Sequence, residues 1–205
     1  MNITINNINS SYFEKAIEIF TDAFVSDPLH KFAFPDEKER KKITGLIYEL
    51  VILTIVPEMK LKIKGAFVND KLAGAIIYTP PGSFSGWNDK LDKAVKKMRR
   101  KAKNEKIKLI GEYAMTIGKF KPKTPHFYLN ELAVSPDMQG KGIGTKLMLS
   151  VEPECIAHLT AIGLALDTTN LRNVKLYKKI GYKVINKFDF YELKVYCMYK
   201  TIRKI

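Results

Sequence analysis

The sequence predicts an α/β fold of the α+β type, in which a mixed central sheet of about seven strands is flanked by helices. Strand-like and helix-like segments follow one another in the order β-α-α-β-β-α-β-α-β-α-β-β. A glycine-rich turn at 139–145 lies between an apolar strand candidate and an amphipathic segment. The 205 residues are 46% hydrophobic, which is enough for one well-packed core. We therefore expect residues 1–205 to form a single domain.

The first elements of the chain are a short strand and two helices. Residues 3–5 alternate in polarity as a strand does. Ser11 and Glu14 have the spacing of a capping box, which predicts a helix that reaches about Phe24. A second helical pattern runs from about 36 to 56.

A hairpin is predicted next. Two strand-like runs, 65–68 and 72–79, flank Asn69, Asp70 and Lys71, and these turn formers favour a tight connection. A segment with two prolines and a glycine then ends the second strand.

The region 82–120 is helical in pattern and basic. Apolar residues recur at helical spacing at Leu91, Ala94, Met98 and Ala102. Lysine and arginine crowd the remaining positions between 96 and 108, in a chain whose formal net charge is +14. Because no aromatic interleaving or recognition motif accompanies them, we interpret them as a solvated helix face. Nucleic acid would be attracted only nonspecifically, so no specific nucleic-acid partner is predicted.

The second half of the chain alternates strands with helices. A strand at 127–134 precedes the glycine-rich turn, and Pro153 is expected to kink or break the following helix near Val151. A short strand and another helix come next. Strands at 182–186 and 192–199 then close the fold as an antiparallel pair.

The glycine-rich turn is the most informative segment. It consists of Gln139, Gly140, Lys141, Gly142, Ile143, Gly144 and Thr145. Its glycines let the backbone approach a ligand closely, and a helix that starts there presents free N–H groups, so a phosphate or pyrophosphate is the expected occupant. The alternative is a tight connection whose glycines serve packing alone. A Walker loop is excluded because Lys146 follows Thr145 instead of preceding it, and the dinucleotide fingerprint lacks its third glycine. The pattern that fits is Q-x-x-G-x-G.

A second motif lies downstream, where Asn173, Tyr177, Gly181 and Tyr182 fit the pattern N-x-x-x-Y-x-x-x-G-F/Y. Asn173 and Tyr177 share one helix face, and Gly181 ends that helix. With both motifs at this distance and in this order, the chain resembles the GNAT superfamily of N-acetyltransferases over essentially its whole length. In that superfamily the first motif is the coenzyme A pyrophosphate loop.

A narrower resemblance concerns the branch that contains puromycin N-acetyltransferase. The residues that carry it are Ala23, Phe24, Asp27, Pro28, Phe34, Pro35, the strand entry at 125–129, Pro153, Asp167 and Thr168. Asp167 stands where that branch more often has glutamate. This resemblance implies a relative, not a shared substrate.

The superfamily resemblance implies acetyl-CoA as co-substrate and no metal. Backbone N–H groups of 139–145 would hold the pyrophosphate, and the pantetheine arm would lie along the 127–134 strand, where the fourth and fifth strands splay apart and leave backbone groups unpaired. The residues expected to bind the cofactor are Leu132, Ala133, Val134, Gln139, Gly140, Lys141, Gly142, Ile143, Gly144, Thr145, Asn173 and Tyr177.

The same resemblance implies direct attack of an amine on the thioester, with Tyr177 protonating the leaving thiolate. The identity of the general base stays open. The superfamily's usual positions fall on Asn130 and Tyr128, and neither is a good base at neutral pH. Glu131 is the neighbouring carboxylate, and it would face the site only if a bulge turned it. A water chain could serve instead, as could a carboxylate from another segment, such as Asp27 or Glu112.

The expected acceptor is a primary amine of a small molecule, bound by the first two helices and by 82–120. An acidic lining from Asp22, Asp27 or Glu49 would suit a cationic amine, and His30 is a further candidate. Two different functions stay open: transfer to a protein or peptide amine, and a non-catalytic module that binds CoA for regulation. The terminal strand pair offers a surface for a homodimer.

No membrane-spanning segment is predicted, because the chain has no apolar run of about 18 residues or more. Its start also lacks the features of a signal peptide. Cys155 and Cys197 form neither a zinc pattern nor a disulfide framework. We therefore expect a cytoplasmic protein.

Overall fold

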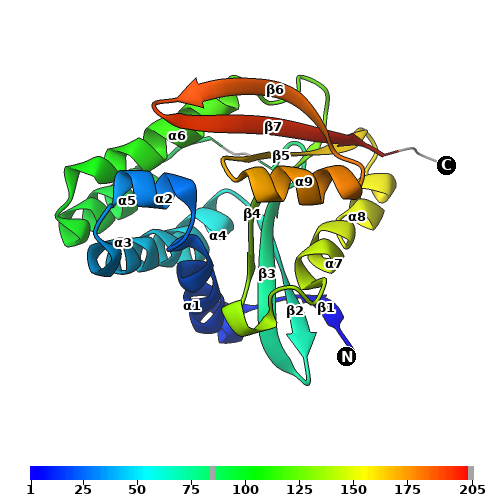
Figure 1. Ribbon diagram of the computed structural model, residues 1–205, viewed down its shortest axis with the longest axis horizontal. Helices are drawn as coiled ribbons and strands as arrows, with labels where there is room; N and C mark the ends of the chain where they lie inside the picture. The colour runs from blue at the N-terminus through cyan, green and yellow to red at the C-terminus, as the bar shows by residue number, and fades with distance from the viewer. Residues whose placement is uncertain (84–85, 203–205) are drawn as a thin grey trace.

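The computed structural model describes residues 1–83 and 86–202, and it contains a seven-stranded sheet with helices on both faces (Figure 1). The strands are β1 (Thr4–Asn7), β2 (Lys62–Val68), β3 (Lys71–Thr79), β4 (Phe127–Val134), β5 (Gly163–Thr168), β6 (Lys183–Phe190) and β7 (Leu193–Thr201). The α-helices are α1 (Phe13–Phe24), α2 (Pro28–Ala33), α3 (Glu37–Leu50), α4 (Val56–Glu58), α5 (Asp89–Ala102), α6 (Lys108–Gly118), α7 (Ile143–Leu149), α8 (Glu152–Ala157) and α9 (Leu171–Lys179). Shorter helical turns are η1 (Ser10–Tyr12), η2 (Val51–Ile55), η3 (Glu105–Ile107) and η4 (Pro136–Met138).

The sheet is mixed, with strand order β1-β2-β3-β4-β5-β7-β6. Strands β4 and β5 are parallel neighbours, whereas the other neighbouring strands are antiparallel. The parallel pairing joins only Phe127 to Leu164 and Tyr128 to Ala165. Beyond Tyr128 the two strands part, and in Figure 1 β2–β4 run at a steep angle to β5–β7. The predicted mixed sheet of seven strands, splayed between the fourth and fifth, is confirmed.

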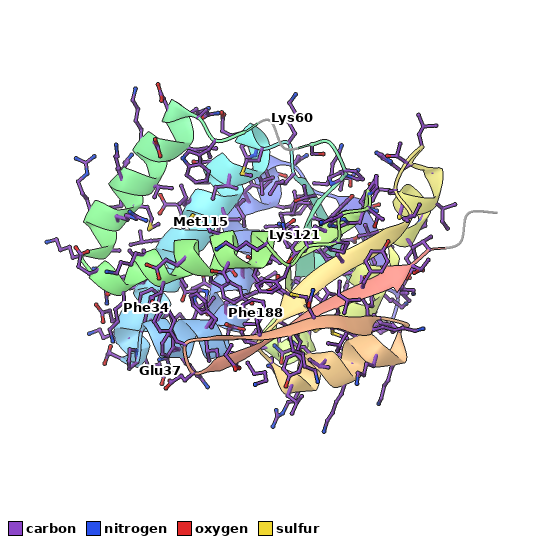
Figure 2. The ribbon with its side chains drawn as sticks, turned by 90° about the horizontal axis from the view of Figure 1, so that it is seen from above. Phe34, Glu37, Lys60, Met115, Lys121 and Phe188 are labelled. Atoms are coloured by element: carbon purple, nitrogen blue, oxygen red, sulfur yellow. The ribbon has the colours of Figure 1, made fainter. Side chains whose placement is uncertain are left out.

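Helices α7, α8 and α9 cover one face of the sheet through a core that contains Leu147, Cys155 and Tyr177. Helices α1 and α3 pack on the opposite face over β2–β4. Helix α6 covers the same face over β5–β7 (Figure 2). The segment after it stacks Phe120 on Phe188 of β6, with ring centroids 4.1 Å apart. The sheet therefore lies between two helical layers.

A bulge interrupts the pairing of β3 with β4. Ile77 is opposite Glu131 and Tyr78 is opposite Leu129, so Asn130 is the extra residue. Because side chains alternate along a strand, the inserted residue moves Glu131 onto the face that Tyr128 occupies. This is the local distortion that the sequence required if Glu131 was to point that way.

Local residue chemistry explains most of the elements. Asn69 and Asp70 adopt φ values of 48° and 61° in the tight β2–β3 turn, as the hairpin pattern predicted. Pro153 separates α7 from α8 around Val151, also as predicted. Gly181 follows α9 with φ of 97°, a conformation that favours glycine.

The predicted capping box at the first helix is not formed. Asn9 Oδ1 instead accepts hydrogen bonds from the backbone N–H and the hydroxyl of Ser11. The hydroxyl of Ser11 is thus used as a donor, and the chain makes the turn η1 before α1 starts at Phe13.

Helix α2 was not predicted, although Asp27 and Pro28 form a recognisable start. The Asp27 side chain accepts a hydrogen bond from Leu29 N–H, and Pro28 occupies the first helical position. The helix predicted for 36–56 is also divided: α3 gives way to the π-helical turn η2 before Pro57, which has no N–H to donate to the preceding turn.

The basic region 82–120 forms two helices, α5 and α6. Lys103 follows α5 with φ of 52°, a left-handed conformation that ends this helix before α6. Leu91 and Ala102 are the buried residues of α5. Positions 84 and 85 of this region lie outside the described residues. Among the helices within 1–83 and 86–202, none has both the length and the apolar character that a bilayer crossing requires.

Candidate active site

The glycine-rich turn connects β4 to the first turn of α7. Gly140 and Gly142 have φ of 76° and 77°, and a Cβ at either position would meet nothing within 4 Å. Gly142 precedes α7 without a side-chain cap, so the first N–H groups of that helix are free for an anion. The turn has the open face and the exposed donors that a phosphate-binding loop needs.

The predicted cofactor residues occupy both sides of this connection. Gln139 Nε2 donates to Val134 O at 3.2 Å and so links the turn to the end of β4. A Cβ on Gly144 would lie 3.6 Å from Val134 and 3.7 Å from Leu132, which is ordinary packing distance. Lys141 Nζ bonds back to Asp137 O at 2.9 Å, within its own turn.

The edge of β4 that faces β5 is where the pantetheine arm was expected. Pairing along this edge ends at Tyr128, and the remaining residues of β4, with Leu132, Ala133 and Val134 among them, have ladder partners on β3 alone. The backbone groups on the β5 side of this segment are therefore available to a ligand.

Three carboxylates gather on the α1–α6 face of the sheet; we call Asp27, Glu131 and Asp167 the carboxylate cluster. Each of these residues is only partly buried by exposed area. Enough protein nevertheless surrounds each carboxyl group to raise its pKa, to about 6 for Asp27 and about 8 for Glu131. Burial is the main cause, and neighbouring negative charge adds to it.

Tyrosines hold two of these carboxylates. Tyr48 OH donates to Glu131 Oε2 at 3.1 Å. Tyr113 OH and Tyr128 OH donate to the two oxygens of Asp167, one each. Burial raises the pKa of Asp167 as well, while both phenol hydrogen bonds oppose the rise.

Tyr177 lies in α9 on the opposite face, yet the carboxylate cluster acts on it. Burial raises its pKa above the usual 10, and the charges of Asp167, Asp27 and Glu131 add to the rise. Its side chain is 7% exposed, and its hydroxyl makes no hydrogen bond to any described residue. A protonated phenol without a partner thus stands near three carboxylates. Asn173, one turn earlier on α9, is partly buried.

Several residues suggested for the acceptor side are engaged elsewhere. Asp22 pairs with Lys41 at 3.0 Å and Glu49 with Lys101 at 3.4 Å, whereas Glu112 accepts from Tyr191 OH at 3.2 Å. Of the three carboxylates proposed as an acidic lining, only Asp27 joins the cluster. His30 is 4% exposed and its Nδ1 bonds to Thr44 Oγ1 at 2.9 Å, so it belongs to the core.

The two positions that usually carry the superfamily's base also have partners. Asn130 Oδ1 accepts from the Thr79 hydroxyl at 2.7 Å, and Tyr128 is bound to Asp167. Sequence reasoning missed Tyr48 and Tyr113 as members of the site. Tyr48 is 83 positions from Glu131, and no local pattern marks either tyrosine.

Comparison with known proteins gives one family and many structural neighbours. The model of the Acetyltransferase (GNAT) family matches residues 17–182. A structure from Corynebacterium glutamicum ATCC 13032, described as histone acetyltransferase HPA2 and related acetyltransferase, is 18% identical with a TM-score of 0.71, over 100% of this chain and 99% of that one. Arylalkylamine N-acetyltransferase 2 from Aedes aegypti is 18% identical with a TM-score of 0.70, over 99% and 100%. The paia N-acetyltransferase from Thermoplasma acidophilum, solved in complex with coenzyme A, is 18% identical with a TM-score of 0.60, over 98% and 99%.

Proposed function

The chain belongs to the acetyltransferase (GNAT) family, and from that premise we propose that it transfers an acetyl group from acetyl-CoA to a primary amine of a small molecule. Membership makes it an acyl-CoA N-acyltransferase that uses acetyl-CoA, and the resemblance inferred from the two motifs is confirmed. The observation that supports the proposed acceptor is the carboxylate cluster, whose negative charge beside Tyr177 would attract a cationic amine.

The residues of the glycine-rich turn fit the cofactor. N–H groups of 139–145 would hold the pyrophosphate, and the free edge of β4 would bond the amides of the pantetheine arm at Leu132 and Val134. Asn173 would orient that arm from α9. Ala133 faces the other side of the sheet, against the α1–α3 core, so its backbone is its only means of contact.

Glu131 is the proposed general base. The bulge at Asn130 puts it on the acceptor face, and its pKa of about 8 brings its proton affinity closer to that of an amine. Its ionised form, which increases as the pH rises towards 8, would accept a proton from the ammonium group. The amine nitrogen would then form its bond to the thioester carbonyl carbon. A backbone N–H, assigned to Val134, would donate to the oxygen that becomes negative.

Tyr177 is the proposed general acid. Because its pKa is raised, it holds its proton at neutral pH and has one to give. As the carbon–sulfur bond breaks, the leaving thiolate would take this proton, and the second proton of the attacking nitrogen, released as the amide forms, would return through solvent to Tyr177. The proton taken from the ammonium group before attack would leave Glu131 for solvent. The products are an N-acetylated amine and free CoA.

A protein or peptide amine is the alternative acceptor. A lysine or an N-terminus of a protein could supply it, and the Corynebacterium neighbour is described as a histone acetyltransferase. A non-catalytic CoA-binding regulator would keep the turn but have no use for Tyr177. The placement of Glu131 by the bulge, together with the free hydroxyl of Tyr177, favours catalysis.

The test combines thiol release with thermal shift. Wild type should release thiol from acetyl-CoA with at least one member of a panel of small amines, and Tyr177→Phe should lose about 100-fold in kcat. Both proteins should show the same thermal shift with CoA, because a ligand of the folded state raises its stability. Thermal shift without thiol release from any amine or peptide would identify a regulatory module. Equal kcat in Tyr177→Phe would remove Tyr177 from its role.

The remaining expectations continue as proposals. We propose that residues 1–205 act as one catalytic domain and that 82–120 contributes to the acceptor side, as Tyr113 of α6 does by bonding Asp167. Cys155 and Cys197 are buried and are not joined in a disulfide, which suits a reducing compartment such as the cytoplasm. Strand β6 is an edge strand, so a homodimer through it is a further proposal, which size-exclusion chromatography would test.

A further inference from the structure

The carboxylate cluster contains more carboxyl groups than one general base needs. Its members come from three elements: the start of α2, the bulge of β4 and the end of β5. Asp167 raises the pKa of both Asp27 and Glu131, and Asp27 raises that of Glu131, so the three act on one another. Only one carboxylate is required to deprotonate the amine.

This charge is not balanced by ion pairs. Among the described residues, no lysine, arginine or histidine forms an ion pair with Asp27, Glu131 or Asp167. The nearest compensating charges act at longer range, from Lys31 on Asp27 and from Lys121 on Asp167. Because its pKa is about 8, Glu131 is largely protonated near neutral pH, so the negative charge lies mainly on the other two members. Partly buried carboxylates with so little compensation are costly in the absence of a cation.

The reacting amine cannot balance this charge throughout the reaction. It must be neutral when it attacks, so at that moment it contributes no positive charge to the cluster. A second cationic group on the same molecule would remain charged. The carboxylates are also not gathered at a point, because no group of three or more His, Cys, Asp or Glu side chains in the described residues could hold a metal ion. A cluster spread over three elements fits an elongated cation.

Tyr177, on the opposite face of the sheet, is a second feature that points to a ligand near these carboxylates. The hydroxyl of Tyr177 is on a side chain more than nine-tenths buried, has no partner in the described residues and lies within the field of all three carboxylates. The surroundings of Tyr128, which bonds Asp167, also accept an alkylammonium group. Nζ of Lys121, labelled near the middle of Figure 2, lies 3.6 Å from the centroid of the Tyr128 ring.

We propose that the acceptor is a diamine or polyamine, in which one amine reacts between Glu131 and Tyr177 while a second ammonium group binds Asp167 with support from Asp27. This inference rests on the proposed function, since it names the substrate class of the same site. Tyr113 and Tyr128 fix the orientation of Asp167, and each of its oxygens keeps a further lone pair for the ligand.

The experiment compares matched amines that differ by one charge. Thiol release from acetyl-CoA is measured with 1,4-diaminobutane and butylamine, and with the corresponding pairs of three, five and six carbons. Calorimetry measures the binding of the same amines to the CoA-loaded protein. We expect the best diamine to exceed its monoamine at least about tenfold in kcat/KM and in affinity.

Two variants assign this preference to the cluster. Asp167→Asn should lower kcat/KM for the diamine about tenfold or more, mainly through KM, and change the monoamine about threefold at most. Asp27→Asn keeps the cap on α2, because asparagine also accepts from Leu29 N–H, and it should reduce the preference by a smaller factor. Asp22→Asn, on the surface of α1, is the control and should leave the preference for the diamine unchanged.

The outcomes separate this inference from the proposed function. Monoamines as good as diamines throughout the series would overturn the inference while leaving an acetyltransferase. An equal loss with both amines in Asp167→Asn, or no binding of any diamine, would also overturn it. If diamines bind in an Asp167-dependent way but no amine releases thiol, the inference on the ligand holds and the catalytic function fails. An unchanged thermal shift with CoA shows that each variant is folded.

Discussion

Replacing Glu131 with glutamine should slow the reaction and make the folded protein more tolerant of alkaline pH. Burial raises the pKa of this carboxyl group from 4.5 to about 8. The folded protein therefore holds the proton more tightly than the unfolded chain does. The resulting stabilisation is fully present below about pH 4.5 and is lost as the pH rises through about 8. Glutamine has no such proton, and it can still accept the hydrogen bond from Tyr48.

The size of the effect follows from the two pKa values. Between about pH 6 and about pH 8, ionisation of Glu131 lowers the free energy of unfolding of the wild type by about 2.3 kcal/mol. The decrease is about 1.3 kcal/mol for a folded pKa one unit lower. The pH dependence of the free energy of unfolding should be smaller by this amount in Glu131→Gln. Over the same range, kcat/KM should rise with pH in the wild type, and Glu131→Gln should lose about 100-fold and most of that rise.

Urea unfolding of both proteins at the two pH values measures the stability difference. Glu18→Gln serves as the matched control, because Glu18 is 58% exposed and pairs with Lys15 at the surface of α1. Parallel pH dependence in wild type and Glu131→Gln would refute the assignment of a buried, titrating proton to this site. A large loss of the CoA thermal shift in Glu131→Gln would mean that the substitution disturbs more than the base.

Three glycine substitutions test the backbone arguments. Gly74→Ala should lower the free energy of unfolding by about 2 kcal/mol or more, because its Cβ would lie 2.8 Å from the carbonyl oxygen of Ala133. Gly111→Ala should raise it by about 0.5–1 kcal/mol, since this glycine is in α6 with open space around it. Gly142→Ala should cost about 1–2 kcal/mol, because alanine is strained at φ of 77°, and should reduce the thermal shift with CoA. Urea unfolding measures all three, and a stabilised Gly142→Ala with an undiminished CoA shift would contradict the role of the turn.

Features that depend on neighbouring residues could be predicted from the sequence. The hairpin at Asn69 and Asp70, the helix break at Pro153 and the left-handed Gly181 each follow from the chemistry of one or two residues. The glycine-rich turn belongs to this class, which is why it identified the family. Strand β4 was located at its observed bounds because its apolar run ends at Ser135 and Pro136.

Features that depend on distant residues could not be predicted from the sequence. The bulge arises from the pairing of β4 with β3, so the sequence left open whether Glu131 would face the site. The bonds from Tyr48 to Glu131 and from Tyr113 to Asp167 join residues 83 and 54 positions apart. Asp22 and Glu49 were reasonable acceptor contacts by composition, but their helix faces direct them to surface lysines. Convergence of side chains is a property of the fold and has no signature in a single sequence.

The short contact between β4 and β5 divides the sheet into two sub-sheets, β1–β4 and β5-β7-β6. Two residue pairs of backbone bonding connect them, and the rest of their cohesion comes from side chains, such as Phe127, Leu164 and Met198, that pack across the join. Apolar contacts of this kind are non-directional, unlike a hydrogen-bond ladder. A pantetheine arm bonded along β4 would therefore act as a missing strand as well as a reactant. Binding of the donor substrate would then add backbone pairing at the join between the two sub-sheets.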